Sequence, residues 1–217
     1  MHTLAFSLTV ALLTPVAAAQ PTDSSPAVLE EVVAVVGDAP LLESDVTLAG
    51  LAGLVAAEPG DASPPSRRRV LEARIRLELQ FRDLEASGTL YRLELDVDAA
   101  MVRLVEHGGG DAQLRESLAR AGFGWDELRD LAVRLAAATA YVEQRLRPRV
   151  RVTTDELRAA YSEEVLARFS DSGEPPPPFP EVRDLLQRLL TERELNVQIE
   201  GWLEAAREQR PVTIFRP

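Results

Sequence analysis

The stretch EEVVAVVGDAPLLESDV, residues 30–46, decides how the fold begins. Residues 32–36 are a β-branched run that favours a strand, and residues 37–40 have the composition of a turn. An apolar pair follows at 41–42, so the sequence predicts a small hairpin. Ser44 is a good helix N-cap and Asp45 suits a first helical turn. The chain should therefore start as strand, turn, strand and helix.

The rest of the chain shows helical patterns separated by glycine and proline. Apolar residues recur at helical spacing over residues 45–57, 66–87, 96–105, 111–120, 126–146, 153–169 and 180–203. The band at 66–87 is wider than one helix face, so we expect burial on two sides. VTIF, residues 212–215, should be a strand. Because an isolated hairpin is marginal in water, we expect this strand to add to the one at 32–36.

Charge and composition exclude several kinds of chemistry. The 217 residues carry a net charge of -11, contain no cysteine, and have 24 basic residues that are all arginine. These facts exclude a thiol nucleophile, a thiolate metal site and Schiff-base lysine chemistry. The negative net charge also lacks the basic surface that nucleic-acid binding needs, and it provides no attraction to anionic lipid.

No catalytic motif stands out from the sequence. His2 and His107 are the two histidines, and His2 lies in the segment that we expect to be removed, so the two cannot form a metal site together. The sequence leaves open a pair of glycosidase carboxylates, although nothing marks one. We therefore expect a protein that is not an enzyme and that uses no cofactor or metal ion.

The N-terminus has the pattern of an export signal. Residues 4–13 are apolar, and the alanines at 17–19 fit a small-residue cleavage site. The apolar run is too short for a transmembrane helix. We expect a signal peptide at 1–19 and a flexible mature N-terminus at 20–29. The alternative is a buried N-terminal helix, and the lack of acidic or capping residues argues against it.

Five segments in order resemble the SurA-type periplasmic chaperones. The first is the opening stretch at 30–46, with its strand, turn and helix. The others are VLEARIRLELQFRDLEASG (70–88), DVDAAMVRLVE (96–106), LRESLARAGFGWDELRDLAVRLAAATAYVEQRL (114–146) and VTTDELRAAYSEE (152–164). The final segment, from FPEV at 179 to VTIF at 215, is similar to the family's C-terminal helix and strand. The resemblance covers about residues 30–217.

The resemblance implies a mostly α fold. It places a helical domain like the SurA N-terminal domain at 30–169, with a small β-sheet formed by the N-terminal hairpin and the C-terminal strand. The family's parvulin prolyl isomerase domain is missing, and a Pro-rich linker at 170–180 stands in its place. The C-terminal helix and strand at 181–217 should pack back on the N-terminal domain.

The Pro-rich linker has three interpretations. Its four prolines, residues 175–178, form a stiff spacer that can cross the gap left by the missing domain. An ordinary disordered loop and a ligand for an aromatic groove are the alternatives.

The resemblance also implies a function. It predicts a periplasmic, ATP-independent holdase that binds unfolded or extended polypeptides, with outer-membrane β-barrel proteins as clients and without isomerase activity. The alternatives are a periplasmic adaptor or assembly subunit that binds one folded partner, and a homodimer formed by swapping the C-terminal segment.

Such a chaperone needs a broad apolar cleft. The candidate cleft residues are aromatic or aliphatic side chains near the glycine-rich turn at 108–110: Met101, Leu104, Phe123, Trp125, Leu128 and Tyr141. For any individual residue of this set, burial in the core is the favoured alternative, and Trp125 is the best candidate for partial exposure.

Overall fold

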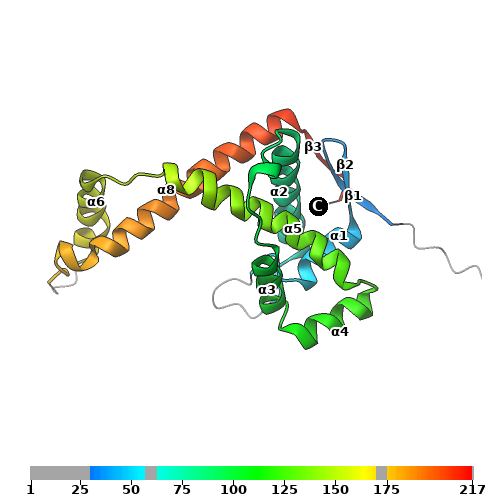
Figure 1. The fold of residues 1–217 in the computed structure, drawn as a ribbon. Coiled ribbons are helices and arrows are strands. Elements are labelled where there is room, and N and C mark those ends of the chain that lie inside the picture. Colours follow the sequence, from blue (N-terminus) through cyan, green and yellow to red (C-terminus); the bar gives the residue numbers. More distant parts are fainter. Residues whose placement is uncertain (1–29, 57–62, 170–174, 217) are drawn as a thin grey trace, which may run out of the picture.

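The computed structural model describes residues 30–56, 63–169 and 175–216 (Figure 1). The expected signal peptide at 1–19 and the expected flexible segment at 20–29 both lie outside these residues. The elements in chain order are β1 (Val32–Val36), β2 (Ala39–Leu42), α1 (Glu43–Leu51), α2 (Arg67–Ala86), α3 (Val97–His107), α4 (Asp111–Ala121), α5 (Trp125–Tyr141), α6 (Thr154–Ala160), α7 (Ala167–Phe169), α8 (Phe179–Gln209) and β3 (Val212–Ile214). The fold is mostly helical with one small sheet, as the sequence predicts.

The C-terminal strand returns to the N-terminal hairpin, which confirms the expected pairing. The sheet has the order β2-β1-β3, and both pairs are antiparallel. Val36 faces Ala39 across the hairpin and Val212 on its other side. The tight turn depends on Gly37, whose φ of +64° favours glycine and whose N–H donates to Pro211 O at 3.0 Å.

Helix α2 lies at the centre of the main core. It packs against β1, α1, α5 and α8, so the predicted burial on more than one side is confirmed. Its buried apolar residues are Val70, Leu71, Ile75, Leu77, Leu79 and Leu84. We call the part built around this helix the body: the sheet, α1 to α5 and α8 from Ile199 onwards.

The body also encloses a charged cluster on α2. Arg74 and Glu78 are 4% and 2% exposed, and their side chains lie 2.9 Å apart. The Glu78 carboxylate also accepts hydrogen bonds from Arg82 and Arg134, and Arg74 reaches Asp45 on α1. A buried charge is tolerated only when it is paired, and here the partners come from three helices. The cluster therefore ties α1, α2 and α5 together.

A second, smaller core lies at some distance from the sheet. Leu157, Ala160 and Leu186 are its buried residues, and they come from α6 and α8. Figure 1 shows α6 against the N-terminal part of α8, on the opposite side of the molecule from the sheet. We call this part the arm: α6, the wide turns at Tyr161–Leu166, α7, residues 175–178 and α8 as far as Gln198.

The predicted helical domain at 30–169 differs from the observed packing at its C-terminal end. Residues 154–160 have their apolar contacts with α8 rather than with the body, because their buried side chains meet Leu186. The expected linker at 170–180 also ends earlier, since α8 starts at Phe179 and includes Pro180 in its first turn. Residues 170–174 lie outside the described part of the chain.

Helix α8 belongs to both cores through different faces. Leu186 is buried in the arm, and Leu195 is buried nine residues later. Nine residues make two and a half helical turns, so the two side chains leave the helix in opposite directions. Leu203 then joins the main core. One continuous helix of 31 residues thus connects the two cores through different faces.

The first helix is shifted from its predicted position. Ser44 is not the N-cap, because α1 begins at Glu43 and the Leu42 N–H donates to the Asp45 carboxylate at 2.9 Å. The helix ends at Leu51 rather than near 57. Gly53, which has φ of +62°, comes shortly after the helix and lies close to His107. A Cβ added at Gly53 would be 2.7 Å from the His107 backbone.

Candidate functional site

Three of the six predicted cleft residues are core residues. Leu104 and Leu128 are 1% and 0% exposed, and Met101 is also buried. All three pack within the main core. The prediction that they line an open cleft does not match their position, because α3 and α5 turn these side chains towards each other and away from water.

Phe123 and Trp125 lie near the start of α5 and are partly buried against the same core. The Arg115 guanidinium sits 3.9 Å from the centre of the Trp125 ring, a distance typical of a cation–π contact. Phe123 borders a small cavity of about 160 Å³ beside Arg74 and Arg134. Trp125 is half-buried, as expected, but its ring face is already occupied.

Tyr141 lies at the other end of α5. Sixteen residues separate it from Trp125, which is about 24 Å along a helix. Its ring is 4.4 Å from that of Trp202, and Trp202 donates a hydrogen bond to the Asp83 carboxylate at 2.9 Å. Tyr141 therefore helps to fix α8 to the body, and the six predicted residues do not meet in one cleft.

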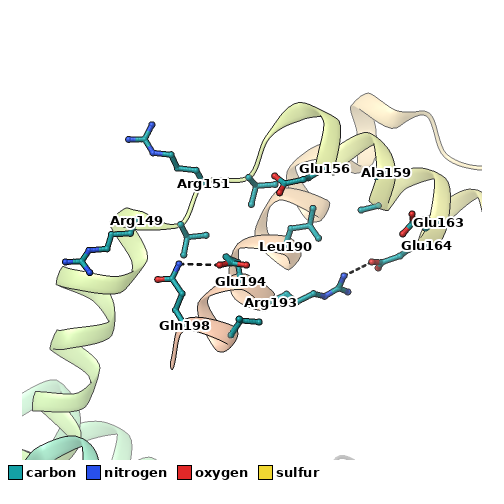
Figure 2. A pocket seen from close by; sticks show the side chains of 14 residues that line it. Arg149, Arg151, Glu156, Ala159, Glu163, Glu164, Leu190, Arg193, Glu194 and Gln198 are labelled. Atoms are coloured by element: carbon teal, nitrogen blue, oxygen red, sulfur yellow. Dashed lines mark hydrogen bonds and ion pairs between the residues drawn. The ribbon is translucent and has the colours of Figure 1, made fainter. Parts of the chain in front are cut away.

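The structure places a larger groove in the arm. Its volume is about 570 Å³, and it lies between the segment that leads into α6, the helical turns after α6, and α8 (Figure 2). The lining residues are Arg149, Val150, Arg151, Val152, Glu156, Ala159, Ala160, Glu163, Glu164, Leu190, Arg193, Glu194, Val197 and Gln198. None of the six predicted residues is among them.

The groove combines aliphatic side chains with fixed charges. Val152, Leu190 and Val197 supply the apolar part, and the glutamates come from α6, the turns that follow it and α8. Arg193 reaches across the groove to Glu164 at 2.8 Å, which Figure 2 shows as a dashed line. Such a mixed lining suits a polypeptide segment, which offers apolar and charged side chains in turn.

Two charges of the groove are stabilised by local hydrogen bonds. The Thr153 backbone N–H and hydroxyl lower the pKa of Glu156, whose Oε2 lies 2.7 Å from that N–H. A hydrogen bond to Glu164 raises the pKa of Arg193. Both shifts favour the ionised form, so these charges stay fixed at neutral pH.

Among the residues that the structure describes, no three His, Asp or Glu side chains are grouped as metal ligands. No helix within residues 30–56, 63–169 and 175–216 has both the length and the apolarity needed to cross a bilayer. No known protein family and no curated protein matches the chain. The groove's own geometry therefore has to support any functional conclusion.

Sequence reasoning missed the groove, although one signal was present. Residues 149–152 read Arg-Val-Arg-Val, which alternates charged and β-branched side chains between two helices. Such alternation indicates an extended segment with two different faces. The opposite wall gave no comparable signal, because it consists of α8 residues that become neighbours of this segment only after folding.

Proposed function

We propose that this protein is a periplasmic holdase of the SurA type that binds unfolded or extended polypeptides without isomerase activity. The ordered resemblance over residues 30–217 supports the family assignment. The observed sheet of N-terminal hairpin and C-terminal strand is the arrangement that the resemblance implies. Export to the periplasm is part of this proposal and rests on the pattern of residues 1–19.

The observation that carries the proposal is exposed aliphatic surface on the arm. Leu185, Leu189 and Val197 of α8 are 57%, 41% and 62% exposed, and Val197 lines the groove. Large apolar side chains gathered on one exposed element point to an interaction surface. Unfolded polypeptides present apolar side chains that folded proteins hide, so they are suitable ligands for this surface.

Outer-membrane β-barrel proteins fit as clients on physical grounds. Their strands alternate apolar and polar residues in segments of about ten residues. A groove with aliphatic and charged walls can bind both faces of such a segment. Binding to the unfolded client shifts its equilibrium by mass action alone, so holding and release need no nucleotide.

The proposed lack of isomerase activity follows from the chain length between two helices. Helix α6 ends at Ala160 and α8 begins at Phe179, which leaves no room for a domain of about a hundred residues. The prolines instead pack on the arm: the Tyr161 hydroxyl donates to Pro177 O at 2.8 Å, and the Tyr161 and Phe179 rings meet edge to face. This spacer closes the arm where the family carries its inserted domain.

The test is suppression of aggregation. A urea-unfolded outer-membrane barrel protein is diluted into residues 20–217, which include every described element, and turbidity is followed. An inert acidic protein of similar size is the control. Suppression near a one-to-one ratio is the expected result. Failure with several unrelated clients would favour an adaptor for one folded partner, and light scattering at several concentrations would reveal a swapped dimer.

A matched pair of variants locates the surface. Val197 on the arm and Val102 on α3 of the body are 62% and 55% exposed. Val197→Ser should weaken suppression, whereas Val102→Ser should leave it unchanged, and neither should alter the melting temperature. Equal loss in both variants would show that the arm has no special role.

A further inference from the structure

The segment that enters α6 is extended but lies in no sheet. Val150 has φ of -70° and ψ of 125°, and Thr153 has φ of -82° and ψ of 161°, both in the extended region. Strands in proteins normally pair through their backbones. Residues 150–153 instead run alone between the body and the arm, along one side of the groove (Figure 2).

Most backbone groups of this segment have no protein partner. The Val150 N–H donates to Arg147 O at 3.2 Å, and the Thr153 N–H donates to Glu156. Within the described part of the chain, the N–H groups of Arg151 and Val152 make no hydrogen bond, and neither do the carbonyls of residues 150–152. The segment therefore presents an unpaired strand edge beside an open groove, the arrangement to which an extended peptide adds.

The side chains of the segment point to the chemistry of that peptide. Arg149 and Arg151 are exposed, and neither forms an ion pair with any described residue. Figure 2 shows both side chains extending away from α8. Val150, which lies between them, and Val152, which follows Arg151, are half-buried and supply the aliphatic part of the groove lining on this side, to which both arginines also contribute. One face of the segment is thus cationic and the other is aliphatic, within a chain whose net charge is -11.

We propose that residues 150–152 pair, backbone to backbone, with an extended client segment in which apolar and acidic residues alternate. The apolar side chains of the client would lie towards Val197 and Leu190 of α8, because cross-strand neighbours share a face. Its carboxylates would lie beside Arg149 and Arg151, which gain the partners that they lack. This inference rests on the proposed holdase function and specifies which segments the groove selects.

Direct peptide binding tests the selectivity. Fluorescence anisotropy is measured with residues 20–217 and three labelled decapeptides: one alternating valine and glutamate, one alternating valine and lysine, and one with the valines and glutamates in two blocks. The alternating acidic peptide should bind at least about fivefold more tightly than the other two. Equal binding of all three would overturn the proposal.

Charge reversal supplies the matched control. Arg149→Glu combined with Arg151→Glu should reverse the preference, so that the lysine peptide binds better. Arg92→Glu combined with Arg103→Glu makes the same change of net charge at two exposed body residues, and it should leave the preference as it was. Circular dichroism should show both variants folded, because none of the four arginine side chains has a hydrogen-bond or ion-pair partner in the described structure. An unchanged preference in the first variant would overturn the proposal.

Amide exchange tests the backbone pairing. The unbonded N–H groups of Arg151 and Val152 should exchange rapidly in the free protein, and one of them should be slowed at least about tenfold by the acidic peptide, because alternate N–H groups face opposite edges of a strand. Peptide binding with neither amide slowed would overturn the backbone pairing.

The two proposals fail in different ways. Suppression of turbidity together with equal binding of all peptides removes this inference and leaves the holdase. Selective peptide binding without suppression of turbidity removes the holdase function and leaves the peptide selectivity. A dimer without peptide that dissociates in the Arg149→Glu, Arg151→Glu variant would assign the strand edge to a second copy of the chain and overturn the proposal.

Discussion

The body and the arm are built from the same helix but are supported very differently. The body surrounds α2 with a sheet and several helices and encloses a charged cluster. The arm core has three fully buried side chains, Leu157, Ala160 and Leu186. Elements with little buried apolar surface open most easily, so the arm should be the less stable part. The groove therefore lies on the part of the molecule that can yield to ligands of different shape.

The largest expected effect comes from removing body packing on α8. Leu203 is 0% exposed in the main core, so Leu203→Ala should lower the free energy of unfolding by about 4 kcal/mol through lost burial and a cavity. Urea unfolding followed by circular dichroism measures the change. Leu189→Ala, on the same helix but 41% exposed, should cost less than about 0.5 kcal/mol. Similar costs for the two variants would contradict the stronger support that α8 receives in the body than in the arm.

The next effect concerns charge within the body. Arg74 with Glu78 and Arg68 with Glu72 are both four residues apart on α2, and both pairs meet at 2.9 Å. Only the first pair is buried. Glu78→Gln should therefore cost about 3 kcal/mol, because it leaves arginines without their shared carboxylate, whereas Glu72→Gln should cost at most about 0.5 kcal/mol. Urea titration of both variants measures the two losses of stability and shows whether burial, and not the four-residue spacing, sets the cost.

Acid should remove the Glu78 contribution. Burial raises the pKa of Glu78, but the charges and hydrogen bonds of Arg74, Arg82 and Arg134 outweigh burial and lower it overall. The unfolded chain then binds the proton at a higher pH than the folded one. Stabilisation is complete above the unfolded pKa of about 4.3 and is lost as the pH falls through the folded pKa. The stability difference between Glu78→Gln and the unaltered protein should thus be constant from pH 7 to 5 and shrink below about pH 4.

A smaller effect is expected in the arm. Leu186→Ala should weaken the arm core by about 2 kcal/mol, at the low end for a buried leucine because so small a core can collapse around the cavity. Amide exchange should accelerate in α6 and the start of α8, while the unfolding midpoint of the body stays the same. If the whole protein lost stability as it does in Leu203→Ala, the body and the arm would be one cooperative unit.

The smallest effect should come from the cap of α6. The Thr153 hydroxyl accepts a hydrogen bond from the Glu156 N–H, and Glu156 bonds back to the Thr153 N–H. Thr153→Ala should cost about 1 kcal/mol, again seen as faster exchange in α6. Thr153→Ser keeps the hydroxyl and should behave as the unaltered protein. A loss in the serine variant would assign the effect to the methyl group instead.

Local signals in the sequence predicted most element boundaries. The capping box of Thr153 and Glu156 begins α6, and Gly122 ends α4 with φ of +81°. These features depend on neighbours a few residues away, which the sequence shows directly. The end of α1 was predicted less well, because Gly53 responds to His107, more than fifty residues later.

The candidate site was predicted less well for the same reason. Apolar spacing correctly placed Met101, Leu104 and Leu128 on inward helix faces, but it gave no information on whether those faces meet water or each other. The groove needs both Val152 and Val197 in its lining, and the sequence holds no local record that these two residues come together. The unpaired backbone of residues 150–152 likewise becomes visible only when every possible strand partner has been placed elsewhere.

The sequence by itself determined the helices, the hairpin and the return of the last strand, because apolar periodicity and turn residues act over short distances. Only the tertiary structure decided how α8 divides its faces between two cores. Its apolar residues shift around the axis along its length, and a sequence pattern does not state which neighbour each face will meet. Burial is a property of the assembled chain, so the body, the arm and the groove between α6 and α8 emerge only when the elements pack.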